Sequence, residues 1–250
     1  MFNWYWVFLF YLFVLHLRLV TCTIYLHRGI SHEVIEITPA GESLFKFFMW
    51  ITRFYFDNYV KILRAQHCIH HAYSDSSKDI HSPYHLTVTQ LLDFNHNDPK
   101  RPYYIIPEDL EKYSKNIVIH ETWLDNNLYK PYQNYGWLLW LPIIYLLFGP
   151  VATLIGFVLI KYIGEIHTLI ANYVFHKWGY SENRPTTEDK SKNIFPLGIL
   201  LAGEELHNNH HNNPKNAKFS QRWFEFDLGW VYILALAKLN LVVLKQHKAN

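Results

Sequence analysis

The sequence has only two cysteines among its 250 residues, Cys22 and Cys68, and charged side chains make up only 18% of it. Two cysteines cannot build a disulfide-dependent secreted fold or supply four thiolates to a metal cluster. The 23 Lys and Arg residues are nearly balanced by 21 Asp and Glu, so the net charge of +2 gives no basis for a nucleic-acid partner. Half of the residues are hydrophobic, which excludes an intrinsically disordered chain.

Histidine is the residue type that stands out, with 16 copies. Three clusters contain half of them: HRGISH at 27–32, HCIHH at 67–71 and HNNHH at 207–211. In the second and third clusters the HxxHH spacing places three imidazoles on one face of a helix. In the first cluster the five-residue interval rotates the second ring by about 140° on an ideal α-helix, so we expect a helix end or a distortion there.

An Asn-x-x-x-His pair, Asn172 and His176, adds a ninth candidate imidazole, because residues four apart share a helix face. Neutral imidazole is the commonest protein ligand of metals, and nine are too many for one octahedral ion and suitable for two. Imidazole suits Zn, Cu, Fe or Ni, but structural zinc sites usually contain cysteine. We therefore favour a pair of redox-active irons, with Asn172 holding a metal-bound water.

The chain begins with an apolar segment, about 4–26, whose main interruptions are His16 and Arg18. It is long enough to cross a hydrocarbon core of about 30 Å and lacks the basic start and small-residue cleavage site of a signal peptide. We predict a retained membrane anchor in which Arg18 snorkels to the surface or faces another helix. Such apolar runs and the polar stretches between them average to a mean hydropathy of −0.07.

A second apolar run, about 132–170, is interrupted by Gly149 and Pro150. Proline removes a helical hydrogen bond, so the run is predicted to form a membrane hairpin with arms 132–149 and 150–170. A hairpin also keeps the histidine clusters on one side of the membrane. Its tip has no Lys or Arg while its flanks do, which indicates a cytoplasmic active site.

The fold is predicted to be all-α and a single domain over 1–250, with multi-pass membrane helices and a cytosolic helical cap carrying the histidine-rich diiron site. An interfacial helix is expected at about 44–59, because Lys46, Arg53 and Asp57 interrupt that apolar segment. The cap comprises 60–131 and 171–250, and an amphipathic helix at 223–244 packs on it.

The stretches TIYLHRGISH, QHCIHHAYSDSSKDIHSP, NYVFHKWGY, GEELHNNHH and WFEFDLGWVYI resemble the integral-membrane fatty acyl desaturases of the stearoyl-CoA desaturase-like family, and its bacterial branch most. The resemblance covers about 23–242. It implies that two irons are bound by His27, His32, His67, His70, His71, His176, His207, His210 and His211, and through water by Asn172.

The same resemblance implies O2-dependent formation of a cis double bond, commonly at Δ9, in a long-chain acyl-CoA or acyl-carrier-protein substrate at a lipid bilayer. Electrons would come from a separate ferredoxin, rubredoxin or cytochrome b5 type donor with its reductase, because the sequence contains no fused haem domain. Animal members have two spans before the first histidine cluster. This chain has room for one, so either its N-terminus lies opposite the active site or a further membrane span precedes this sequence.

Three further sets of residues are candidates around the site. Carboxylates and one histidine close to the clusters are expected to orient the ligand rings, although each can equally be a solvated surface group: Asp75, Asp79, His81, Glu204 and Glu205. Trp178 is expected to line an acyl tunnel or to pack in the core. Basic residues are candidates for contact with a phosphorylated carrier or lipid headgroups: Lys61, Arg64, Lys215, Lys218 and Arg222.

Two alternatives remain open on this sequence. A diiron hydroxylase of fatty acids, alkanes or sterols shares the first hydrogen abstraction, so ligand spacing does not separate it from a desaturase. A membrane protein that stores or senses a metal without catalysis would also need clustered histidines.

Overall fold

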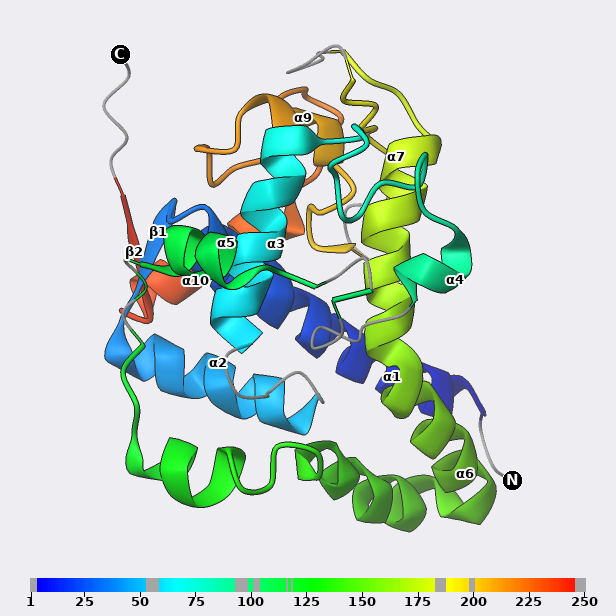
Figure 1. Ribbon diagram of the computed structural model, residues 1–250. Coiled ribbons are helices and arrows are strands. Elements are labelled where there is room, and N and C mark those ends of the chain that lie inside the picture. The colour runs from blue at the N-terminus through cyan, green and yellow to red at the C-terminus, as the bar shows by residue number, and fades with distance from the viewer. Residues whose placement is uncertain are drawn as a thin grey trace.

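The computed structural model describes residues 4–52, 59–92, 99–100, 104–115, 117, 119–182, 188–197 and 201–245. The fold is mostly helical, as predicted (Figure 1). The first half of the chain contains α1 Trp4–Thr21, η1 Cys22–Ser31, β1 Ile35–Ile37, α2 Pro39–Ile51, α3 Tyr59–Tyr73, α4 Val88–Leu91 and α5 Pro107–Ser114. The second half contains η2 Asp125–Tyr129, η3 Gly136–Leu139, α6 Trp140–Leu169, η4 Ile170–Val174, α7 Phe175–Lys177, α9 His207–Asn212, α10 Leu228–Lys238 and β2 Val242–Leu244.

Two helical segments are long and apolar enough to cross a membrane by length and composition, Trp4–Ser31 and Gly136–Tyr162. Large apolar side chains on the second point outward, with Leu146 82% exposed and Leu154 69% exposed. A contiguous exposed apolar surface of this kind indicates a membrane or a partner. Together with the resemblance to membrane desaturases, it supports a membrane location.

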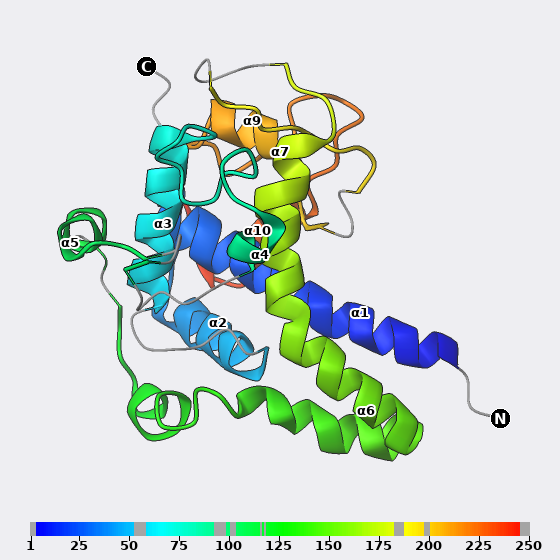
Figure 2. The ribbon, with the colours of Figure 1, turned by 45° about the vertical axis from the view of Figure 1, so that its right-hand side comes forward.

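Helix α6 is broken where Gly149 precedes Pro150. Gly149 has φ 79° and ψ −178°, a conformation that lacks a penalty only for glycine. The two arms meet at this break, one running along the bottom of the molecule and one rising toward α7 (Figures 1 and 2). The interruption expected from Pro150 is confirmed, and each arm packs on α1 through a cluster that includes Val14, Ile144 and Ile160.

Arg18 faces other helices, which is one of the two outcomes expected for it. Its side chain is 4% exposed and donates a hydrogen bond of 2.8 Å to the carbonyl oxygen of Thr52. It also lies against Gly164 of α6, where an added Cβ would come within 2.3 Å of the guanidinium. A glycine at this position lets α1 and α6 approach with the arginine between them.

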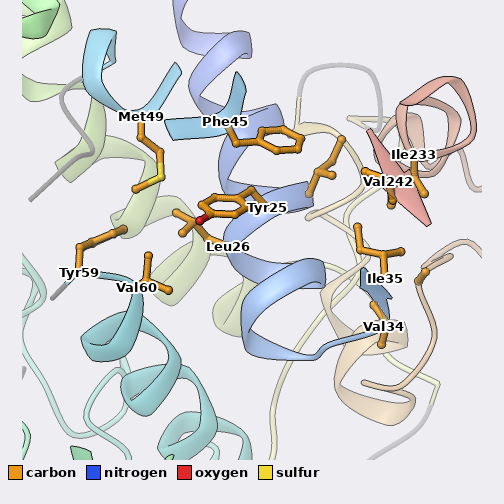
Figure 3. Packing of buried hydrophobic residues seen from close by; sticks show 12 residues of the cluster. Tyr25, Leu26, Val34, Ile35, Phe45, Met49, Tyr59, Val60, Ile233 and Val242 are labelled. Carbon is orange, nitrogen blue, oxygen red and sulfur yellow. The ribbon is translucent and has the colours of Figure 1, made fainter. Parts of the chain in front are cut away.

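The main core lies where η1, α2, α3 and α10 meet (Figure 3). Tyr25 stacks on Phe45 with ring centroids 5.4 Å apart, and Met49, Tyr59 and Ile233 close the cluster around them. Because this core contacts the helices that carry the first two histidine clusters, it holds those helices in register with each other.

The segment expected as a helix at 44–59 begins earlier. Helix α2 starts at Pro39 because Thr38 caps it, accepting a hydrogen bond of 3.2 Å from the Gly41 backbone N–H. It ends at Ile51, and residues 53–58 lie outside the described residues.

The prediction of a helix over 223–244 is wrong in its bounds, because the helix in the structure is shorter. Helix α10 begins after Asp227, whose carboxylate accepts the Trp230 backbone N–H at 2.9 Å, and it ends at Lys238. Asn240 then adopts φ 55°, a left-handed conformation that terminates helices. The chain continues into β2, which pairs antiparallel with β1 in the register Ile35 to Leu244 and Ile37 to Val242. Sequence periodicity did not indicate this two-stranded ribbon.

A buried ion cluster joins α2 to the segment before α6. Lys46 is 4% exposed and lies 3.0 Å from Glu42 and 3.2 Å from Asp125. Its Nζ also donates to the carbonyl oxygen of His120 at 2.6 Å. Removing one partner from such a cluster leaves uncompensated buried charge.

Lys46→Met should destabilise the protein by about 3–5 kcal/mol, because the carboxylates of Glu42 and Asp125 lose their common cation. The matched control is Lys130→Met, which breaks the exposed pair with Glu121 and should cost at most about 1 kcal/mol. Thermal unfolding in detergent measures the difference. Equal shifts in the two variants would contradict a stabilising role for the buried cluster.

Candidate metal centre

The first histidine cluster sits on a π-helical turn. The Cys22–Ser31 segment is π-helical, and the His32 backbone N–H donates to the His27 carbonyl oxygen at 3.0 Å. A π-helix bonds residues five apart, so it brings positions i and i+5 onto the same side, which an α-helix does not. The expected distortion is confirmed, and it explains how HxxxxH places both rings together, with centroids 5.0 Å apart.

The second and third clusters lie on α3 and α9, which meet at one end of the molecule beside α7 (Figures 1 and 2). Their three rings do not converge on one point. His67 and His71 of α3 turn to one group of ligands and His70 to another. Residues i and i+4 are about 40° apart around a helix, whereas i+3 lies on the other side of i. Each HxxHH therefore serves two sites.

The nine imidazoles form two groups in which all candidate ligand atoms lie within 4.8 Å of one another. We call them the five-histidine group and the four-histidine group. The first consists of His27, His32, His67, His71 and His210, and the second of His70, His176, His207 and His211. The structure thus brings together every histidine that the sequence singled out.

Ring nitrogens within each group approach very closely. In the five-histidine group the Nε2 atom of His210 lies 2.9 Å from Nε2 of His27 and 3.0 Å from Nε2 of His71. In the four-histidine group the Nε2 atoms of His207 and His176 are 3.1 Å apart. Two nitrogens bound at right angles to one ion at about 2.1 Å would lie about 3.0 Å apart. The spacing fits a shared metal ion.

The protonation of the rings also fits metal binding. Burial first, and then repulsion between neighbouring rings, lowers the pKa of six of them: His32, His67, His71, His207, His210 and His211. These rings are neutral at neutral pH and keep a lone pair for a metal. The Nε2 atom of His211 is buried and has no hydrogen-bond partner in the described structure, as expected of a ligand atom. Both buried groups are able to bind metal.

Carboxylates hold the opposite nitrogen of four of the rings. The Nδ1–H groups donate from His27 to Glu204 at 2.9 Å, from His70 to Asp79 at 3.0 Å and from His176 to Asp75 at 2.8 Å. Such bonds fix the tautomer and aim Nε2 at the metal. Asp75, Asp79 and Glu204 thus each accept a hydrogen bond from a histidine that the sequence predicted as a ligand.

Asp189 completes this set and was missed by the sequence reading. It is 2% exposed and accepts the Nδ1–H of His211 at 2.7 Å. It lies 22 residues before its histidine, in a polar stretch without helical spacing to the ligands. Only the folded chain brings the two together, so no local motif could identify it.

The charges of two of these carboxylates are stabilised. Burial alone would raise the pKa of Glu204, but His27 and Arg28 outweigh it and hold the pKa well below the usual range. The same balance, with His70 as the compensating group, lowers the pKa of Asp79. Both groups therefore remain anionic acceptors.

Arg28 was also missed, although it lies inside the first cluster. It is fully buried and lies 3.3 Å from Glu204 and 3.1 Å from Asp227. Its guanidinium stacks on Phe219 at 3.6 Å. It joins the π-helical turn to the segments on both sides of the third cluster.

Glu205 and His81 differ from the other predicted orienting residues. Both carboxyl oxygens of Glu205 are buried without a hydrogen-bond partner in the described part of the chain, and burial raises its pKa to about 8. Its carboxyl accepts no hydrogen bond from a ligand ring there. His81 is 9% exposed, and its ring lies 5.5 Å from that of His70, with which it also shares Asp79 as a neighbour.

The remaining predicted residues are not members of the two histidine groups. Asn172 is half-buried on the η4 turn, four residues before His176. Trp178 is 57% exposed and packs edge-to-face on Tyr173, so it lies at the surface. Of the basic residues, two are half-buried on α3 and three are exposed after α9: Lys61 and Arg64, then Lys215, Lys218 and Arg222.

Comparison with known proteins gives relatives of one kind. No family model matches the chain. It is 27% identical to an acyl-CoA C20 Delta5-desaturase of Anemone leveillei, over 88% of this chain and 67% of the relative. The Delta-9 acyl-lipid desaturase 1 of Arabidopsis thaliana is 27% identical over 88% of this chain and 68% of the relative.

A third relative is the sn-1 stearoyl-lipid 9-desaturase of a Synechocystis strain, 26% identical over 88% of this chain and 65% of the relative. Identities this similar do not single out the bacterial branch that the sequence motifs suggested. The chain is a distant relative, over most of its length, of the membrane fatty acid desaturases.

Proposed function

We propose that this protein is an O2-dependent membrane desaturase that introduces a cis double bond, at Δ9, into a long-chain fatty acyl thioester. The observation that carries this proposal is the division of nine imidazoles, six buried and three half-buried, into two groups with ligand-like nitrogen spacing. Desaturase relatives along most of the chain support the same activity.

In this proposal each histidine group holds one iron. Asn172 acts on an iron through a water. When bound, the irons supply the activation of O2 that attack on an unactivated C–H bond requires. The chain's own residues do the rest. Carboxylates keep the Nδ1 proton of four rings in place, and the burial of the ligands keeps bulk water from the reacting positions.

The substrate carrier and the double-bond position go beyond what the relatives establish. Their names include both acyl-CoA and acyl-lipid enzymes and both Delta5 and 9 positions. We propose a CoA or acyl-carrier-protein thioester. Lys215, Lys218 and Arg222 are exposed after α9, where they can meet a phosphorylated carrier or lipid headgroups. Electrons come from a separate donor protein, and the active site faces the cytoplasm.

Expression in a host that lacks unsaturated fatty acids tests the reaction. The expected product is an acyl chain lighter by two hydrogens, with the double bond located by mass spectrometry. A product heavier by one oxygen would instead identify a hydroxylase. Unchanged lipids and no O2 consumption by folded, iron-loaded protein with reductant and acyl substrate would favour a non-catalytic metal protein.

His210→Ala and His70→Ala should each abolish desaturation and lower the iron content of the purified protein. Each substitution removes one ligand atom from a different histidine group. The control is His120→Ala, because the His120 side chain is exposed and in neither group. Elemental analysis and lipid analysis are the measurements. Full activity of either variant would remove that residue from the ligand set.

Glu204→Gln and Glu205→Gln change neighbouring carboxylates with opposite surroundings. Glu204 accepts from a ligand ring, so its loss should weaken iron binding by roughly 10- to 100-fold. Glu205 makes no hydrogen bond to a ligand ring in the described structure, and burial raises its pKa to about 8, so its replacement should leave iron binding unchanged. Competition with a chelator measures both. Equal weakening would contradict the assignment of Glu204 as the orienting residue.

A further inference from the structure

The carboxylates that hold the ligand rings are unevenly divided between the two histidine groups. In the described structure the four-histidine group has three of them, since Asp79, Asp75 and Asp189 accept from His70, His176 and His211. The five-histidine group has one, Glu204, which accepts from His27. The two prospective metal positions therefore lie in different electrostatic surroundings.

A buried cation lies beside the carboxylate of the five-histidine group. Glu204 shares Arg28 with Asp227, so these three groups sum to a formal charge of about −1. Asp75 accepts from the Lys190 backbone N–H and from the Ser82 hydroxyl. These partners are neutral and leave the carboxylate charge in place.

The other two carboxylates of the four-histidine group are held in a similar way. Asp79 accepts from the backbone N–H groups of Asp75 and His81 at 2.8 Å each. Asp189 accepts from the Ser191 backbone N–H at 2.8 Å. Together with Asp75, they place three carboxylates beside the four-histidine group.

Burial makes this charge effective. Asp75 is 3%, Asp79 3% and Asp189 2% exposed, so little solvent screens them. A carboxylate behind an imidazole raises the basicity of the ligand, and negative charge near a metal favours its more positive oxidation state. In the described structure the five-histidine group has one such carboxylate, Glu204. The higher ligand basicity and the nearby negative charge both lower the reduction potential of an iron in the four-histidine group.

We infer that the two irons are inequivalent, with the iron of the four-histidine group having the lower reduction potential, and that Asp189 is a positioning residue for that iron. This inference rests on the proposed function. Fe(II) at this position loses its electron to a one-electron oxidant before the iron of the five-histidine group does. The product at that point is one ferric and one ferrous ion.

A redox titration of the full chain tests this order. The protein is loaded with ⁵⁷Fe in detergent and oxidised stepwise with ferricyanide, and Mössbauer spectra count the ferric and ferrous ions. Two separate one-electron steps are expected. Asp189→Asn should raise the lower potential, by about 59 mV for a tenfold change in the ferric to ferrous ratio, and should leave the upper step in place. Glu204→Gln should raise only the upper step.

Glu108→Gln, which removes an exposed carboxylate on α5, is the matched control and should move neither step. A single two-electron step in the wild type would overturn the inference. A lower step that responds to Glu204→Gln but not to Asp189→Asn would also overturn it.

If Asp189→Asn does not fold, two variants that each keep only one complete histidine group test the inference instead. His32→Ala retains the complete four-histidine group and His207→Ala the complete five-histidine group. The iron kept by His32→Ala should have the lower potential, and the reverse order would overturn the inference. Fewer than two irons per wild-type chain would overturn the proposed diiron function and this inference with it, whereas two irons that titrate together would overturn only the inference.

Discussion

The constraint on which this structure depends is the close approach of nine imidazoles in two groups. Nε2 atoms come within 2.6 Å for His32 and His67 and within 2.9 Å for His27 and His210. Facing lone pairs repel unless a proton or a cation lies between them, and burial disfavours the proton. The chain therefore holds an arrangement that is fully satisfied when metal is bound, so metal binding contributes to the stability of the fold.

Helix geometry achieves this approach through two devices. The π-helical turn at 22–31 brings residues five apart together, which gives HxxxxH a single direction. The α-helical HxxHH clusters do the opposite and divide their rings, because the i and i+4 pair points to one group and the i+3 ring to the other. Helices α3 and α9 each contribute rings to both groups and so connect them. The two metal positions are consequently adjacent and cannot move independently.

Much of this was predictable from the sequence, and the reasons for the rest are physical. Helical periodicity and histidine spacing are local, so they identified the nine histidines that form the two groups, the need for a distortion near His27 and the break at Pro150. The partner of His211 could not be found in this way, because Asp189 reaches it through loop contacts rather than through spacing. The β1–β2 ribbon joins segments about 200 residues apart, as the pairing of Ile35 with Leu244 shows. Its short strands carry no periodic signal of their own.

Arg28 explains how the distant segments are brought to the metal positions. Its guanidinium pairs with Glu204, just before the third cluster, and with Asp227, which caps α10. Asp227 also accepts the Phe219 backbone N–H at 2.7 Å, and Phe219 packs on the ring of His210 at 4.6 Å. One buried cation thus positions a ligand of the first cluster, a ligand of the third and the C-terminal helix. Since a lone buried charge is costly, the loss of one of these contacts is expected to weaken the others. The metal centre is therefore assembled by long-range ion pairing as much as by the histidine clusters themselves.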